Sequence, residues 1–159
     1  MNATFYRLPS PATFADWRRR TPEDFTLAVK ASRFLTHVER LRDSEEPVAR
    51  LMEAAGELGP RLGPILLQLP PDMRCDLGRL EATLAAFPDG LRIAVEPRHA
   101  SWLEAGTRAL LERHDAALCM ADRPSWRPPL WRTASWGYLR LHEGRASPRP
   151  CYGVRAPDS

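Results

Sequence analysis

The sequence predicts an α/β fold in which helices alternate with the strands of a parallel sheet. Two observations lead to this prediction. Short continuous apolar runs, as in PILLQLPP, alternate with segments whose apolar residues recur at the helical period. Each run also ends at a polar residue. Helices that alternate with buried strands are typical of βα units, whose parallel strands are joined by right-handed crossovers.

The individual elements follow in order along the chain. The predicted strands are residues 25–30, 64–71, 91–96, 116–122 and 136–142, and the residues before Phe5 are predicted to end a sixth. The predicted helices start at capping residues: Ser10 before Pro11, Asp43 or Ser44, Asp76, and a capping box of Ser101 and Glu104. Residues 123–135 carry three prolines and no helical period, which predicts a loop.

Composition narrows the class of protein. With 159 residues, 43% hydrophobic and 27% charged, the chain is predicted to form one globular domain over residues 1–159, with an irregular tail at 146–159. Neither a membrane span nor a signal peptide is indicated, so the cytoplasm is the expected location. The three cysteines have no CxxC spacing and are interpreted as reduced thiols. A net charge of +3 favours anionic partners without requiring nucleic acid.

Polar side chains at the strand ends are the strongest functional signal. They are Lys30, Gln68, Glu96, Asp122, Arg140 and His142. In a barrel these ends converge on the face that carries functional residues. The alternative is that they mark only where each strand leaves the core.

Basic residues surround the same strand ends. His37, His99 and His142 follow them, together with Arg33, Arg98 and Arg123. A positive rim around Glu96 and Asp122 suits a phosphate, a carboxylate or a nucleic-acid backbone. Solvated loop charges are the alternative.

Three other kinds of chemistry are open at this stage. A divalent metal could use Glu96, His99, Asp122 and His142, although their spacing matches no known ligand motif and ion pairs are commoner. Lys30 could form a Schiff base, but a pairing with Glu96 is the commoner outcome. In the proline-rich loop, tryptophans 126, 131 and 136 alternate with arginines 123, 127 and 132 and could stack bases; packing over the rim explains them more readily.

Six ordered motifs support a family resemblance: NATFYRLPSPATFADW, FTLAVKASRFLTH, GPILLQLPP, LRIAVEPRHASW, ALCMADRPSW and YLRLHEGR. Together they resemble the YecE-like family, also called domain of unknown function 72, from Asn2 to about Tyr152. The resemblance implies a TIM-like (β/α) barrel rather than an open sheet, and it implies no established reaction.

The chain departs from the family pattern at both ends. It starts at Met1-Asn2 without the preceding strand and helix, and GVRAPDS ends it without the last helix and strand. A TIM barrel takes about 250 residues. We therefore expect an incomplete barrel with about six of eight strands, truncated at both ends, whose unclosed edges could pair with a partner chain or another copy.

The leading hypothesis is an enzyme that acts on an anionic, phosphorylated or nucleic-acid-related substrate by acid/base or metal-assisted chemistry. Glu96, Asp122, Lys30 and His142 are its candidate catalytic residues, and Gln68, Arg98, His99, Arg140 and His37 are its candidate ligand-binding residues. The alternatives are a non-catalytic nucleic-acid or protein binding module and a nonfunctional fragment.

Overall fold

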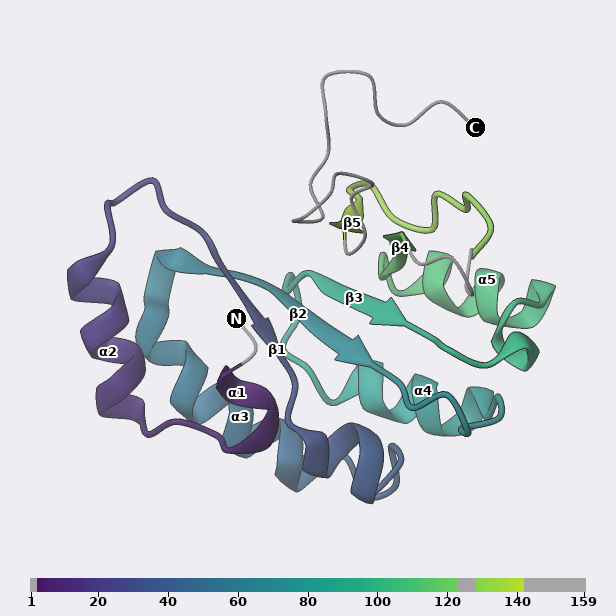
Figure 1. Cartoon of the computed structure of the whole chain (residues 1–159), viewed down its shortest axis with the longest axis horizontal. Coiled ribbons are helices and arrows are strands. Elements are labelled where there is room, and N and C mark those ends of the chain that lie inside the picture. Colours follow the sequence, from purple (N-terminus) through teal and green to yellow (C-terminus); the bar gives the residue numbers. More distant parts are fainter. Residues whose placement is uncertain (1–2, 123–127, 142–159) are drawn as a thin grey trace, which may run out of the picture.

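Five parallel strands form the centre of the molecule. The computed structural model describes residues 3–122 and 128–141. Its strands are β1 (Leu27–Lys30), β2 (Leu62–Gln68), β3 (Ile93–Glu96), β4 (Ala117–Asp122) and β5 (Tyr138–Leu141). Every neighbouring pair in the order β1-β2-β3-β4-β5 is parallel. The sheet curls into a half-barrel, so the α/β prediction is confirmed (Figure 1).

Helices connect the strands. They are α1 (Ala3–Tyr6), α2 (Pro11–Arg20), α3 (Glu45–Ala55), α4 (Leu77–Ala85) and α5 (Ala105–Arg113), with a π-helix at Phe34–Val38 and 3₁₀ turns at Gly56–Arg61 and Ala100–Trp102. Helices α3, α4 and α5 lie along one face of the sheet (Figure 1). Among the residues described, no helix has the length and apolarity needed to cross a membrane.

Strand alternation separates the sheet into two faces. One face packs on the helices in a single apolar cluster that includes Val29, Leu67, Val95 and Leu118. The opposite, inner face holds a smaller cluster that includes Leu66, Ala94, Ala117 and Cys119. Because side chains alternate between the two faces, the last residues of β1, β2 and β3 lie on the inner face. These residues are Lys30, Gln68 and Glu96.

Two of the four predicted helix starts use the expected cap. Ser10 Oγ accepts from Thr13 N at 3.3 Å ahead of α2, and Asp76 Oδ1 accepts from Arg79 N at 3.0 Å ahead of α4. Ser44 precedes α3, but its hydroxyl lies 2.6 Å from the Thr83 hydroxyl and makes no cap bond.

The capping box predicted for the last helix is wrong. Helix α5 begins at Ala105 with Glu104 at the N-cap position. Ser101 lies in the preceding 3₁₀ turn, where its hydroxyl accepts from Cys75 N at 2.8 Å. The side chain is already engaged with a distant backbone group, so it cannot cap the helix.

The predicted strand before Phe5 is also wrong, because residues 3–6 form the single turn α1. Thr4 Oγ1 donates to Lys30 O at 2.6 Å, and the Phe5 ring lies against the Lys30 ammonium. The segment therefore crosses the end of β1 instead of pairing with its edge. Among the described residues the sheet has five strands, not six.

Side chains anchor the part of the proline-rich loop that the structure describes. Thr133 Oγ1 donates to Ala116 O at 2.7 Å and accepts from Leu118 N at 2.8 Å, so it is tied to β4. Asp115 accepts from Ser135 N at 2.6 Å. Residues 123–127 and the tail predicted at 146–159 lie outside the described residues.

Candidate functional site

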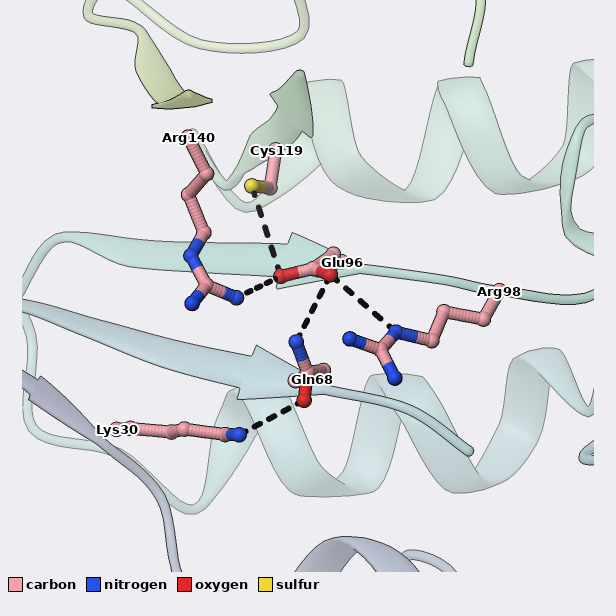
Figure 2. A network of polar contacts seen from close by, with 6 residues as sticks. All are labelled: Lys30, Gln68, Glu96, Arg98, Cys119 and Arg140. Carbon is pink, nitrogen blue, oxygen red and sulfur yellow. Dashed lines mark hydrogen bonds and ion pairs between the residues drawn. The ribbon is translucent and has the colours of Figure 1, made fainter. Parts of the chain in front are cut away.

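A chain of polar contacts runs along the inner face at the carboxyl ends of the strands (Figure 2). Lys30 Nζ donates to Gln68 Oε1 at 2.7 Å, and Gln68 Nε2 donates to Glu96 Oε1 at 2.8 Å. Arg98 Nε lies 3.3 Å from Glu96 Oε1, and Arg140 Nη1 lies 2.5 Å from Oε2. The network therefore joins β1, β2, β3 and β5 through one carboxylate.

The chemistry of its neighbours fixes the orientation of the Gln68 amide. A lysine ammonium can only donate, and an ionised carboxylate can only accept. The amide oxygen must therefore face Lys30 and the amide nitrogen must face Glu96, as observed. The sequence suggested that Lys30 pairs directly with Glu96. In the structure the two side chains are linked through Gln68.

Glu96 stays ionised despite being only 1% exposed. Burial by itself would raise the pKa of Glu96. Hydrogen bonds from Gln68 and Arg140, together with the charges of Arg140 and Arg98, outweigh that effect and hold the pKa below its usual value. A carboxylate whose two oxygens both accept from donors is a weak base, so its main effect is to hold the two arginines in place.

Cys119 lies on the inner face beside this carboxylate, with its Sγ 4.0 Å from Glu96 Oε2. Burial, followed by the negative charge of Glu96, raises the pKa of the thiol to about 12. The nucleophilic form of cysteine is the thiolate. Cys119 is therefore held as a thiol and packs in the inner cluster.

Positive charge exceeds negative charge around the network. Lys30 Nζ lies 3.6 Å from the centre of the Phe5 ring, a cation–π contact. Burial and the charges of Lys30, Arg33 and Arg98 lower the pKa of His37 to about 4. This part of the edge therefore presents several cations and a neutral imidazole.

Two hollows in the described part of the surface lie away from the Glu96 network. A hollow of about 170 Å³ is lined by Phe5, Tyr6 and Phe34, among others, and one of about 420 Å³ lies beside Trp131 and Trp136. Neither is lined by the residues bonded to Glu96. We therefore locate the candidate site by its charges and hydrogen bonds, which decide what a site can bind, and not by cavity volume.

Known proteins with similar sequence or structure identify the family. A family model described as "Protein of unknown function DUF72" matches residues 1–157. The chain belongs to the DUF72 family. It is 31% identical over 130 residues to UPF0759 protein YecE of Escherichia coli strain K12, a match that covers 77% of this chain and 48% of that protein. The chain thus spans about half the length of the curated relatives it matches.

Solved structures of DUF72 family proteins share the fold. A crystal structure from Enterococcus faecalis V583 aligns with a TM-score of 0.76 at 21% identity and covers 97% of this chain and 62% of that one. A second, from Thermotoga maritima MSB8, aligns with a TM-score of 0.69 at 28% identity and covers 88% and 57%. The resemblance to the YecE-like family is confirmed.

Within the DUF72 fold, five of the predicted site residues come together. They are Lys30, Gln68, Glu96, Arg98 and Arg140. His37 lies close enough to Lys30 to contact the same Phe5 ring. The convergence expected at the strand ends therefore involves four strands and one following loop.

Two other predicted residues are placed differently. In β4, Asp122 follows the parity of Leu118 and Met120, on the helix side of the sheet, whereas Cys119 is on the inner face with Glu96. His99 Nδ1 accepts from Ser101 N at 3.1 Å and contacts the Ser101 hydroxyl at 2.9 Å. That nitrogen is therefore engaged within its own turn.

The remaining predictions concern a metal and the tryptophan loop. Across residues 3–122 and 128–141, no three His, Cys, Asp or Glu side chains gather as a metal site would require; His142, the fourth candidate ligand, lies outside this part of the chain, as do Arg123, Trp126 and Arg127. Trp131 packs on the main core, and Trp136 packs on the inner cluster with its Nε1 donating to Asp115 O at 3.2 Å.

Sequence reasoning missed three residues that shape this DUF72 site. Phe5 covers Lys30, Thr4 binds the end of β1, and Thr36 contacts His37 at 2.8 Å. The adjacency of Thr36 and His37 was a usable signal, because Thr hydroxyls commonly bond nearby groups. Nothing in the sequence indicated that α1 would lie over β1.

Proposed function

We propose that the carboxyl edge of this sheet binds an anionic group of a small molecule, and that the complete barrel is an enzyme acting on that molecule. The supporting observation is the Glu96 network, in which Arg98 and Arg140 flank one buried carboxylate and Lys30 adds a third cation. Cations held by buried partners are pre-organised, so they bind an anion without paying the full entropy of ordering. Phosphorylated compounds and nucleotides are the expected ligand class.

The proposal gives each side chain a role. Lys30 and Arg140 hold the anion or stabilise developing negative charge, with Arg98 beside them. Glu96 orients the arginines, because its pKa is held low and both oxygens are occupied. Acid/base or metal-assisted chemistry would then fall to His142, because Asp122 lies on the helix side of the sheet.

A metal at Glu96 and His99 is less well supported than an anion. A metal ion would have to displace Gln68 and the arginines from Glu96. His99 Nδ1 accepts from a backbone N–H, which leaves Nε2 carrying the proton of the neutral ring. A nitrogen that carries a proton is a donor and is poorly suited to bind a cation.

Thermal melts with a ligand panel test the proposal: phosphate, sugar phosphates, nucleotides, short DNA and divalent metals. A ligand present at about 100 times its dissociation constant adds about 2.7 kcal/mol of stability. We expect the phosphorylated compounds to raise the Tm, and we expect the exposed Arg33→Ala to weaken this effect. Arg108→Ala is the matched control, since Arg108 pairs with Glu112 on α5.

Two results would count against the proposal. If no anion changed the Tm, the proposed anion site would be wrong. A shift by DNA alone, falling steeply with salt and unchanged in Glu96→Gln, would favour instead the non-catalytic nucleic-acid binding module.

We also propose that β1 and β5, the outer strands of the described sheet, are where further barrel units pair, either from a partner chain or from another copy. Unpaired strand edges carry backbone donors and acceptors that readily pair with another chain. The relatives support the presence of further barrel units in the family, because each is considerably longer than the matched region.

A further inference from the structure

His37 occupies an unusual stretch of backbone directly after β1. It belongs to the π-helix Phe34–Val38, where Glu39 N donates to Phe34 O at 2.8 Å. Single π-turns are rare and frequently occur at functional sites. The following residues Arg40 and Leu41 have φ of 54° and 61°, a left-handed conformation that is costly for side chains of their size.

Hydrogen bonding determines which ring nitrogen of His37 carries the proton. Thr36 Oγ1 lies 3.0 Å from Ser32 O and 2.8 Å from His37 Nδ1. A carbonyl oxygen can only accept, so the single hydroxyl proton must go to Ser32. The hydroxyl then accepts from Nδ1–H of His37. In a neutral ring, Nε2 is consequently the acceptor.

The surroundings keep that ring neutral. Desolvation and the charges of Lys30, Arg33 and Arg98 lower the pKa of His37 to about 4, against a smaller opposite effect of Asp72. The Phe5 ring packs edge-on at 5.0 Å and fixes the plane of the imidazole. In the described part of the chain, no side chain donates to Nε2. A hydrogen-bond acceptor therefore stands among cations.

This inference rests on the proposed anion site. We propose that His37 makes that site prefer an oxyanion that carries a proton, such as phosphate, over one that is fully deprotonated, such as sulfate. The cations attract both ligands. Only the P–OH of phosphate can donate to Nε2, whereas sulfate would place an oxygen lone pair against the nitrogen lone pair. Specificity arises when the wrong ligand leaves a polar group unpaired.

Calorimetric titration with inorganic phosphate and with sulfate, at matched ionic strength near neutral pH, tests the selection. We expect phosphate to bind about tenfold more tightly, as for one hydrogen bond. His37→Asn keeps a donor for Thr36 but has no atom at the Nε2 position. Phosphate should then lose its hydrogen bond, sulfate should be freed from the lone-pair repulsion, and the two affinities should become similar. His114→Asn, at the end of α5, is the control and should keep the wild-type ratio.

An NMR measurement of the His37 ring nitrogens in the wild-type chain tests the proton assignment without any ligand. A ring protonated at Nε2 would overturn the inference and leave the anion site standing. Equal affinity of wild type for phosphate and sulfate, or an unchanged ratio in His37→Asn, would also overturn it. If neither anion bound, the proposed anion site would fail first and the selection with it.

Discussion

The stability of the inner face depends on a single buried charge. Glu96→Gln would leave Arg98 and Arg140 without their carboxylate, although these arginines keep 22% and 16% exposure and can be partly hydrated. Removing one partner of a fully buried pair costs about 3–5 kcal/mol, so we expect about 2–3 kcal/mol here. Urea unfolding at neutral pH measures this loss.

Glu81→Gln is the comparison for that experiment. Glu81 pairs with Arg113 at 2.7 Å, but both side chains are more than half exposed. The loss should be about 0–1 kcal/mol. If both variants lost the same small amount, the Glu96 network would contribute no more than a surface ion pair.

The titration of His37 should appear in the acid stability of the chain. Its pKa is lowered from 6.5 to about 4 in the folded state, so between these pH values the unfolded chain binds a proton that the folded chain does not. Stability is therefore fully present above about pH 6.5 and falls as the pH drops towards about 4. Compared with wild type, His37→Asn should lose less stability over this window in urea titrations. Parallel curves for the two proteins would contradict the lowered pKa.

At the residue scale, the sequence predicted which strand-end residues lie together better than it predicted their partners. Lys30, Gln68 and Glu96 each follow an apolar strand, and parallel strands bring such ends together. Side-chain parity within each strand was equally readable. Leu118 and Cys119 lie on opposite faces, and Asp122 shares the face of Leu118 whereas Glu96 shares that of Cys119. Assigning the faces from this alternation would have placed Asp122 and Glu96 on opposite sides of the sheet. The hydrogen bond that fixes His37 depends on a π-helix, and no periodicity signals one.

At the scale of elements, the approach of β2 to β1 requires a residue without a side chain. A Cβ at Gly63 would lie 2.4 Å from Thr26 Cγ2 and 3.1 Å from Leu27 O. The strands would have to move apart, and overpacking of this kind costs about 1–3 kcal/mol. We expect Gly63→Ala to lower the Tm clearly in a thermal melt.

Gly56 supplies the matched control for this substitution. Nothing lies within 4 Å of a Cβ built there, and its φ of −57° suits any residue. Gly56→Ala should leave stability unchanged or raise it by up to about 1 kcal/mol, because alanine restricts the unfolded chain. Equal destabilisation by the two substitutions would show that close packing at Gly63 is not the cause.

Element boundaries were predictable where local chemistry acts alone. The start of α2 is predictable from Ser10 and Pro11, and the start of α4 from Asp76. The side chains of Ser10 and Asp76 each accept a hydrogen bond from the first turn of the helix that follows. Predictions failed where a side chain bonds a distant group, as Ser101 does with Cys75 N and Thr4 does with Lys30 O. These contacts are set by the tertiary fold and leave no local pattern.

For the molecule as a whole, a parallel sheet was predictable from alternating helices and apolar runs, but its curvature was not. Barrel and open sheet give the same local pattern, and the family resemblance decided between them. The structure describes five curled strands in sequence order. Within residues 3–122 and 128–141 the sheet has one strand fewer than predicted, because α1 carries a short apolar pattern that either a helix or a strand can hold.

The outer face of β5 differs from the corresponding face of the other strands. Val29, Leu67, Val95 and Leu118 are buried beneath helices, whereas Leu139 and Leu141 are 61% and 54% exposed. Exposed leucines on an edge strand are a recognised site of association. We expect the chain to self-associate with rising concentration in sedimentation velocity experiments, and we expect Leu139→Lys and Leu141→Lys to shift it towards monomer.

Leu130→Lys separates this effect from a general gain in charge. Leu130 is 86% exposed but lies in the loop before β5, away from the strand edge. If pairing at β5 drives association, this control should associate like the wild type. A wild-type chain that stays monomeric at all concentrations, or an equal effect of Leu130→Lys, would show that the β5 edge is not an association surface. In that case the barrel units proposed to pair with this sheet would have to meet it at β1.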